Sequence, residues 1–198
     1  MRDDISRPGP RILALGDSLT AGYGLAQRDS FVRQLEALLV ERHGAATVHQ
    51  AGVSGDTSAD GLRRLPRVLA GLGVKPDLAI VEFGANDLLQ GVSPDRMRAN
   101  LDAMLVELGR CGIPVLVAGM KAPTWLGAFT YGFDAVFPAL AEAHGAALYP
   151  FFLDGVVGDP TLTLMDGLHP NARAIGIIVR RMLPFVEAAL ETARGIKV

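Results

Sequence analysis

A serine hydroxyl follows the first apolar run of the chain, and an imidazole lies far downstream of it. Ser18 stands in residues 16–19 (Gly-Asp-Ser-Leu), directly after an apolar run that is typical of a buried strand ending in a tight turn. A serine attacks a substrate only if a base takes its proton, and His169, in residues 166–170 (Asp-Gly-Leu-His-Pro), offers that base. Asp166 lies close enough in a turn to accept from the imidazole Nδ1. These residue types favour nucleophilic catalysis by Ser18, with His169 as base and Asp166 as its orienting group.

Acyl transfer also needs hydrogen-bond donors for the oxyanion that develops on the substrate. Gly55, in residues 52–57 (Gly-Val-Ser-Gly-Asp-Thr), offers an unshielded backbone N–H, and Asn86, in residues 83–87 (Phe-Gly-Ala-Asn-Asp), offers a side-chain amide. Together with the Ser18 N–H they predict an oxyanion hole with three donors.

Each of these residues also has an ordinary structural interpretation. Ser18 could cap a turn, and Asn86 could belong to one. His169 could be an inert loop histidine, and Asp166 could cap the last helix. The catalytic interpretation therefore depends on all four segments occurring together.

The elements that must position these residues alternate along the chain. We expect five strands and five helices, with the strands at residues 12–15, 47–50, 77–83, 114–118 and 146–149 and the helices at 31–43, 57–69, 93–110, 131–144 and 170–194. This alternation predicts an α/β fold with a parallel sheet covered by helices on both faces. Three of the four segments follow consecutive strands, so they should meet at the carboxyl edge of the sheet. Pro66 and Pro184 should each kink or divide a helix.

Length and composition predict a compact chain with one core. The 198 residues are 49% hydrophobic and 20% charged, which suits a single domain at 11–198 preceded by a flexible tail at 1–10. The formal net charge of −2 gives no basic face for nucleic acid. We interpret Arg63, Arg64 and Arg67 as a solvated helix face.

Cysteine and histidine usage limits other chemistries. Cys111 is the single cysteine, so no intrachain disulfide can form, and its place at a helix end predicts a small buried hydrophobe. His43, His49 and His144 show no ligand spacing with other histidines or with cysteine. The sequence thus predicts no metal site, and serine chemistry needs no cofactor.

Location and assembly are only partly constrained. No apolar stretch approaches the length needed to span a bilayer, so we expect no stable membrane insertion. Residues 1–4 are largely charged and lack the apolar core of a signal peptide. We therefore expect a cytoplasmic protein as written, or a periplasmic or secreted one if a removed leader preceded this sequence. The oligomeric state is open.

The four segments, in this order and spacing, resemble those of the GDSL-type (SGNH) hydrolases over about residues 11–190. Residues 16–24 (Gly-Asp-Ser-Leu-Thr-Ala-Gly-Tyr-Gly), 54–58 (Ser-Gly-Asp-Thr-Ser) and 166–171 (Asp-Gly-Leu-His-Pro-Asn) most resemble the bacterial thioesterase, arylesterase and lysophospholipase subfamily. Each segment alone is a weak signal, whereas four in order are specific.

The resemblance implies both a fold and roles for residues. It implies a three-layer α/β/α sandwich whose five-stranded parallel sheet has flavodoxin-like order. It implies that Ser18 is the nucleophile, that Asp166 and His169 complete the triad, and that Gly55 and Asn86 are oxyanion donors. One small departure is Ala85, where close relatives often have glycine, and it leaves the asparagine itself unaffected.

Loops beyond the strand ends should line the substrate pocket. Leu88 and Leu89 follow the third segment, and Trp125 and Leu126 follow the fourth strand, so these apolar side chains could line an acyl or aryl groove. The alternative is that they pack down as core beneath the loops. Glu82, an acid inside a buried strand, must be paired. We expect it to be a structural hydrogen-bonding partner, in preference to a second orienting carboxylate.

The predicted function is that of a serine esterase acting through an acyl-enzyme. Its expected partner is a small-molecule ester: an aryl ester or an ester of a short to medium acyl chain, with thioesters and lysophospholipids as further possibilities. A carbohydrate O-acetylesterase is the alternative among enzymes. A non-catalytic flavodoxin-like module, binding an anion at a helix N-terminus through Ser18 and Gly55, is the alternative outside them.

Overall fold

A five-stranded parallel sheet forms the centre of the molecule. The computed structural model describes residues 9–127 and 129–195, the latter without the side chain of Phe129. The strand order is β2-β1-β3-β4-β5, the order of flavodoxin-like folds, and every strand pairs in parallel. The strands are β1 (Arg11–Gly16), β2 (Thr47–Gly52), β3 (Leu78–Glu82), β4 (Val115–Ala118) and β5 (Ala147–Tyr149). The predicted parallel sheet and its order are confirmed.

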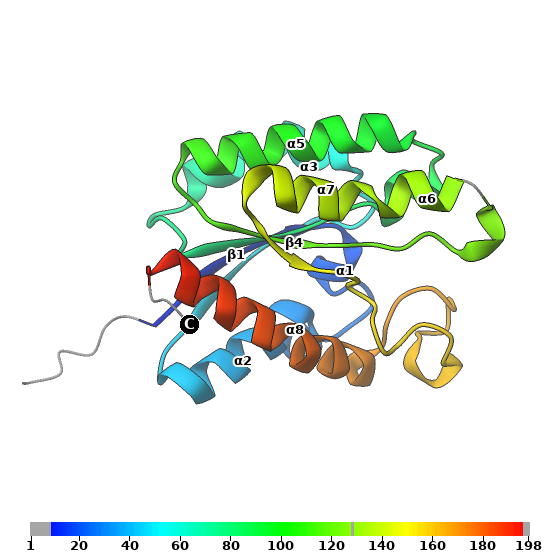
Figure 1. Cartoon of the computed structure of the whole chain (residues 1–198). Coiled ribbons are helices and arrows are strands. Elements are labelled where there is room, and N and C mark those ends of the chain that lie inside the picture. Colours follow the sequence, from blue (N-terminus) through cyan, green and yellow to red (C-terminus); the bar gives the residue numbers. More distant parts are fainter. Residues whose placement is uncertain (1–8, 128, 196–198) are drawn as a thin grey trace, which may run out of the picture.

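Helices cover both faces of this sheet, which makes the three predicted layers (Figure 1). One layer holds α2 (Phe31–His43) and α8 (Ala172–Ala193), which pack against each other. The other layer holds α3 (Ser58–Gly71), α5 (Pro94–Arg110) and α7 (Val136–His144). Because both faces are covered, β3 is buried along its whole length, which explains its nearly continuous apolar sequence.

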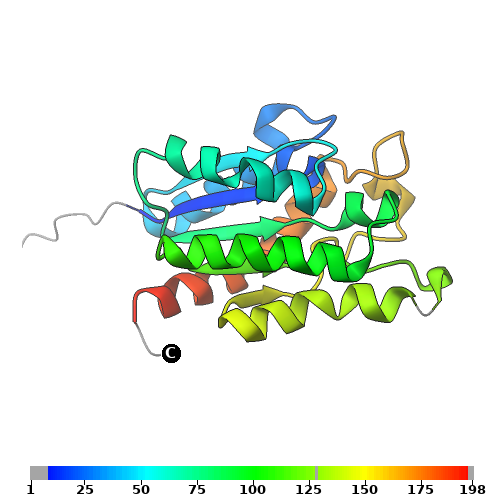
Figure 2. The same ribbon diagram turned by 90° about the horizontal axis from the view of Figure 1, so that it is seen from above.

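The register of the sheet brings the polar segments to one edge. Gly16, the last residue of β1, lies opposite Gly52 of β2 and Glu82 of β3. The segments that follow these strands therefore begin side by side. Figure 2 shows these loops and the loop before α8 at the same end of the molecule, away from the C-terminus. The short elements in these loops are α1 (Ser18–Ala21), η1 (Gln27–Asp29), α4 (Ala85–Leu89), η2 (Thr124–Leu126), α6 (Phe129–Asp134) and η3 (Pro160–Leu162).

Side-chain caps set where the long helices begin. Ser30 caps α2, Ser93 caps α5 with Pro94 as the first helical residue, and Asn171 caps α8. Thr57 caps α3 in a full capping box, in which Asp60 bonds back to the Thr57 N–H. α2 begins at Phe31, as expected, and α3 begins at Ser58, one residue after its expected start.

Several predicted boundaries are wrong. Pro66 and Pro184 each lie inside one helix, α3 and α8, so of the two expected effects division is wrong and a kink stays a prediction. Both prolines are exposed, on the sides of the helices that face away from the core, where a lost backbone bond is tolerated best. The helix expected at 131–144 is two helices, α6 and α7, and α8 begins at Ala172 because Asn171 caps it.

Two further expectations concern the first residues and the cysteine. Residues 1–8 lie outside the described part of the chain, whereas Pro10 is buried and its carbonyl accepts from the Thr47 N–H at 2.9 Å. The fold therefore begins before the expected boundary at residue 11. Cys111 is exposed rather than buried, because it lies at the C-cap of α5, past the last buried residue of that helix, Leu108.

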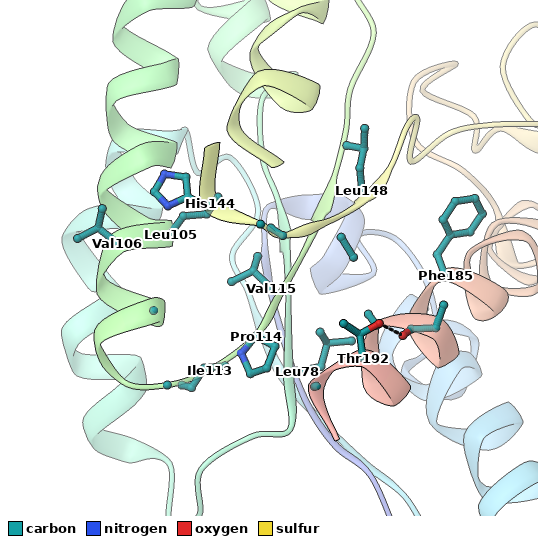
Figure 3. Close-up of a pocket in the computed structure, with 18 of the residues that line it drawn as sticks. Leu78, Leu105, Val106, Ile113, Pro114, Val115, His144, Leu148, Phe185 and Thr192 are labelled. Atoms are coloured by element: carbon teal, nitrogen blue, oxygen red, sulfur yellow. Dashed lines mark hydrogen bonds between the residues drawn. The ribbon is translucent and has the colours of Figure 1, made fainter. Parts of the chain in front are cut away.

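An open apolar groove of about 950 Å³ lies at the other end of the sheet (Figure 3). It runs over the amino end of β4 and beside β5, between the C-terminal halves of α5 and α8. Val115, Leu148, Phe185 and His144 are among the residues that line it. Within residues 9–127 and 129–195, no helix has both the length and the apolar character to cross a membrane.

Candidate active site

Ser18, His169 and Asp166 form a chain of hydrogen bonds at the carboxyl end of the sheet. The Ser18 Oγ lies 2.9 Å from the His169 Nε2, and the His169 Nδ1 lies 2.7 Å from the Asp166 Oδ2. The hydroxyl comes from the turn after β1 and the imidazole from the loop before α8. A proton can therefore pass from the hydroxyl to the imidazole while the carboxylate holds the ring.

A tight turn presents the Ser18 hydroxyl. Ser18 is the first residue of α1, and Asp17 caps that helix by accepting from the Leu19 N–H at 2.9 Å. β2 ends directly beneath this turn: a Cβ on Gly52 would lie only 2.5 Å from the Ala21 nitrogen. Glycine at position 52 is therefore needed for the turn to pack against β2.

The loop that carries His169 is ordered by the same aspartate that orients the ring. The Asp166 Oδ1 accepts from the Leu168 and His169 N–H groups, each at 3.0 Å. These backbone bonds, together with the bond to the imidazole, lower the pKa of Asp166 from 3.8 to about 2. The Leu164 N–H bonds to the His169 carbonyl at 2.7 Å, which closes the loop. Asp166 is therefore ionised at neutral pH.

The ring of Tyr23 contacts the imidazole of His169. The sequence did not predict this contact. The Tyr23 ring lies 4.4 Å from the His169 ring, centroid to centroid, at an interplanar angle of 34°. Its backbone N–H bonds to the Ser18 carbonyl, so nucleophile and stacking ring belong to one turn. The available signal was an aromatic residue between two glycines immediately after the serine segment.

The three expected oxyanion donors differ in how free they are. Within the described residues, neither the Ser18 N–H nor the Gly55 N–H has an acceptor. Gly55 adopts a φ of +88°, which only glycine takes readily, and a Cβ there would meet nothing within 4 Å. Asn86, in contrast, donates from its Nδ2 to the Asp17 Oδ2 at 3.0 Å and to the Asp56 carbonyl at 2.9 Å. Both of its amide hydrogens are therefore engaged in this state.

Arg64 joins two of the segments, so the expectation that it lies on a solvated helix face is wrong. Its Nε lies 2.6 Å from the Asp56 Oδ2, and its Nη2 donates to the Gly16 carbonyl at 2.9 Å. The guanidinium also lies 6.0 Å from the centroid of the Phe83 ring. Arg64 thereby ties the loop after β2 to the end of β1. Arg63 does lie on the exposed side of the helix, paired with Asp60.

A second buried network anchors α4 and with it Asn86. Asp87 is fully buried and accepts from the Ser58 N–H at 2.8 Å and from the Ser58 Oγ at 2.5 Å. The Asn100 Nδ2 donates to the same hydroxyl at 2.9 Å. Because Asn86 precedes Asp87, this network ties α3 and α5 to the placement of the amide.

Glu82 and Asp17 form a buried acidic pair beneath the serine turn. The Glu82 Oε2 accepts from the Thr20 Oγ1 at 2.9 Å and from the Asp17 N–H at 3.3 Å. Burial raises the pKa of Asp17 from 3.8 to about 6. Burial, followed by the charge of Asp17, raises the pKa of Glu82 well above 4.5. Glu82 is thus a hydrogen-bonding partner near the site, as expected.

The expected substrate-binding residues fall into two kinds. Leu88 and Leu126 are half-buried and pack against the core, as the alternative interpretation expected of such residues. Leu89 is 65% exposed and Trp125 is 79% exposed, so both are available to a ligand. Two apolar residues not predicted, Met165 and Leu168, are exposed on the His169 loop itself.

The described residues hold no group of three or more His, Cys, Asp or Glu side chains that could bind a metal ion.

Comparison with protein families agrees with this geometry. Residues 14–174 match the family model of the GDSL-like lipase/acylhydrolase family. The esterase TesA of Pseudomonas aeruginosa is 36% identical over 180 residues, which cover 90% of this chain and 89% of that protein. An arylesterase of Vibrio mimicus is 36% identical over 170 residues, which cover 85% of this chain and 84% of that protein.

A solved structure agrees as well. The crystal structure of AlinE4, described as an SGNH-hydrolase family esterase, superposes with a TM-score of 0.78 at 47% identity. The match covers 93% of this chain and 98% of that one. The fold described above is thus that of an SGNH-hydrolase structure over nearly its whole length.

Proposed function

Because the chain belongs to the GDSL-like lipase/acylhydrolase family and is an ester hydrolase, we propose that Ser18, His169 and Asp166 are its catalytic triad. The observation that carries this proposal is the 2.9 Å distance between the Ser18 Oγ and the His169 Nε2, since it provides a route for the serine proton. The reaction proceeds through an acyl-enzyme on Ser18.

In the first half-reaction the Ser18 Oγ attacks the ester carbonyl carbon while the His169 Nε2 takes the hydroxyl proton. The resulting imidazolium is stabilised by Asp166, which bonds to the Nδ1 at 2.7 Å. The tetrahedral intermediate collapses, the C–O bond to the leaving alcohol breaks, and His169 gives its proton to that alcohol. The acyl group is left on Ser18.

In the second half-reaction water attacks the acyl carbon, and His169 again acts as base. Collapse of this second intermediate releases the carboxylic acid and returns the proton to the Ser18 Oγ. Nucleophile, base and orienting carboxylate are all residues of this chain, and water and the ester are the only other reactants.

The oxyanion of both intermediates is held by the N–H groups of Ser18 and Gly55 and by the Asn86 amide. The first two donors are free to bind it, whereas the Asn86 Nδ2 must share or release one of its bonds to Asp17 and Asp56. A donor that strengthens its bond to the substrate as charge develops contributes to the transition state rather than to ground-state binding.

The substrate class we propose is aryl esters and esters of short to medium acyl chains, with thioesters and lysophospholipids to be tested beside them. The name of the Vibrio mimicus relative, an arylesterase, supports the first class. The exposed apolar side chains of Leu89, Trp125, Met165 and Leu168 support an apolar ligand. A rate that stays flat from acetyl to palmitoyl p-nitrophenyl esters would count against a shaped apolar site.

A serine-directed fluorophosphonate tests the assignment directly. We expect one covalent adduct, located on Ser18 by peptide mass analysis, and loss of both labelling and turnover in Ser18→Ala. Thr192→Ala is the matched control, because it removes a hydroxyl at the groove end of the molecule. Turnover by folded Ser18→Ala at the wild-type rate would refute the assignment of the nucleophile. If the enzyme prefers acetylated sugars to aryl esters, the proposed substrate class is wrong and a carbohydrate O-acetylesterase takes its place.

A further inference from the structure

Glu82 has one carboxyl oxygen that no group in the described structure satisfies. The side chain is fully buried at the end of the central strand β3. Its Oε2 accepts from the Thr20 Oγ1 and the Asp17 N–H, whereas its Oε1 is buried without a hydrogen-bond partner. A buried carboxylate oxygen without a donor is costly, so an ionised Glu82 would be poorly stabilised here.

The surrounding charges make ionisation of Glu82 less favourable still. Asp17, from the α1 turn, lies against it, and Asp87, from α4, adds negative charge around Asp17. His169 acts on Asp17 from the loop before α8. Arg64, from α3, reaches this end of β1 but is paired with Asp56. Between positions 9 and 195, as far as they are described, no Lys or Arg forms an ion pair with Glu82 or Asp17.

Asp17, unlike Glu82, is arranged as an acceptor at both oxygens. Its Oδ1 accepts from the Leu19 N–H at 2.9 Å, and its Oδ2 accepts from the Asn86 Nδ2 at 3.0 Å. A proton on the Asp17 Oδ2 would face an N–H donor. No N–H or O–H group donates to the Glu82 Oε1, so a proton on that oxygen meets no competing donor. A proton shared by the two carboxyl groups therefore belongs on Glu82.

We propose that Glu82 is a positioning residue that works as a neutral carboxylic acid, shares its proton with Asp17, and thereby holds Asp17 between the serine turn and Asn86. This proposal rests on the proposed function, because the groups that it positions are Ser18 and the oxyanion amide. Glu82 touches neither of them directly. It acts through Asp17, which caps the helix that begins at Ser18.

The pKa shifts of the two groups agree with this arrangement. Burial raises the pKa of Glu82 well above its ordinary value, and the charge of Asp17 raises it further. Burial also raises the pKa of Asp17, to about 6, whereas its bond from the Leu19 N–H lowers it. Both directions agree with a proton held by Glu82 beside an ionised Asp17.

Gly16 shows how closely the chain packs around this pair. A Cβ on Gly16 would lie 2.2 Å from the Thr20 Oγ1 and 2.6 Å from the Glu82 Oε2. The glycine of the serine segment is thus needed for the backbone to pass over the carboxyl group. Because the space is this tight, the substitution that disturbs the packing least is one that keeps the shape of the side chain.

The protonation state can be measured on the wild-type protein. With ¹³C-labelled glutamate carboxyl groups, we expect one signal at the neutral-acid position at pH 7, and we expect it to vanish in Glu82→Gln. Glu107→Gln, at a half-buried glutamate of α5 that pairs with Arg110, should leave that signal in place. Ionised signals for all glutamates at pH 7 would overturn the proposal, whatever any variant does.

Kinetics test whether this acid positions the machinery. Gln has the shape of a protonated Glu and can donate to Asp17, so Glu82→Gln should keep kcat for p-nitrophenyl acetate within about 3-fold of wild type at pH 7. Glu82→Leu removes the donor, and its kcat should fall by about 10–100-fold with KM nearly unchanged, approaching the loss of an oxyanion donor. At alkaline pH the wild type should lose activity as Glu82 ionises, whereas Glu82→Gln should not.

A loss of more than about 30-fold in kcat by folded Glu82→Gln would mean that the ionised carboxylate is required, and it would overturn the proposal. An unchanged kcat in folded Glu82→Leu would also overturn the proposal, because the lost donor would then have no effect on the reaction. If Glu82→Leu fails to fold, the wild-type carboxyl signal and Glu82→Gln still decide. The proposed function is tested separately by the Ser18→Ala variant: turnover by that variant would show that the proposed function is wrong.

Discussion

Two histidine–aspartate pairs lie at opposite ends of the sheet, and only one of them is joined to a serine. His169 binds Asp166 at 2.7 Å beside Ser18, and His144 binds Asp102 at the same distance beside the apolar groove. The His169 pair extends to a hydroxyl on its other nitrogen and is surrounded by N–H donors without acceptors. Within the described residues, no hydroxyl bonds to His144.

The difference shows what makes such a pair reactive. A carboxylate can orient an imidazole at many places on a protein surface, but catalysis requires a nucleophile and oxyanion donors at the same point. The groove of about 950 Å³ lies at the amino ends of the strands, away from Ser18 and His169. Hydrogen-bonded turns, rather than the size of a cavity, locate this site.

The two imidazoles give the largest expected contrast. His169→Ala should lower kcat by about 10⁴–10⁶-fold, because the serine loses its base. His144→Ala breaks an equally short bond to an aspartate and should leave kcat within about 2-fold. Steady-state kinetics with p-nitrophenyl acetate measure both, and comparable losses in the two variants would contradict the assignment of His169.

Removing the oxyanion amide should have the next largest effect. Asn86→Ala should lower kcat by about 10²–10³-fold with little change in KM, since the amide strengthens its bond to substrate only in the transition state. Gln90→Ala, an exposed amide just past α4, is the control. A rise in KM at unchanged kcat would show that Asn86 serves ground-state binding instead.

The contact between Tyr23 and His169 sharpens the comparison further, because within the described residues no aromatic ring packs on His144. Tyr23→Leu should lower kcat by about 3–10-fold, which corresponds to the roughly 1 kcal/mol of an aromatic pair. Tyr23→Phe keeps the ring and should restore activity. If Tyr23→Phe and Tyr23→Leu have the same kcat, the ring contact with His169 does not contribute to kcat. The tyrosine hydroxyl or the backbone of the turn would then account for any loss.

Acid should reveal the hydrogen bonds that order the His169 loop. The pKa of Asp166 is lowered to about 2 in the folded protein, so its carboxylate stabilises the fold above its ordinary value of 3.8, and that stabilisation is lost as pH falls through about 2. The difference in unfolding free energy between wild type and Asp166→Asn should therefore be largest above pH 4 and shrink toward pH 2. A difference that grows on acidification would contradict this sign.

The smallest effect is expected in the groove. Ala188→Leu places a larger apolar side chain among the groove-lining residues and should leave kcat and KM within about 2-fold, since the groove lies at the end of the sheet away from the site. Unfolding measurements in parallel show whether the side chain is accommodated. A tenfold loss of kcat in a folded variant would mean that the two ends are coupled.

Most of the fold was predictable because its signals are local. Apolar runs bounded by turns mark each strand, and Ser30 and Thr57 mark helix starts. The continuity of the helices through Pro66 and Pro184 was not predictable. Both prolines lie on exposed helix faces, and only the packed structure shows which face is exposed. The meeting of the polar segments was predictable because parallel strands end at one edge, although no local pattern gives a distance between Ser18 and His169.

Side chains that join distant segments were the hardest to predict. Arg64 looked like one member of a basic cluster, and its bonds to Asp56 and Gly16 exist only after α3 packs beside β1. The stack of Tyr23 on His169 likewise depends on two loops that meet in three dimensions. Glu82 was noticeable as an acid inside an apolar strand, but its unsatisfied oxygen depends on every neighbouring element.

The separation of Ser18 from His169 by 151 positions has a consequence for biosynthesis. The ribosome makes the Ser18 hydroxyl first, and the His169 imidazole follows 151 positions later, just ahead of α8. That helix is held at its first turn by the Gln34 side chain of α2, which donates to the Ala172 carbonyl. On the proposed function, a nascent polypeptide therefore carries Ser18 without its base until the imidazole has been made and α8 has docked.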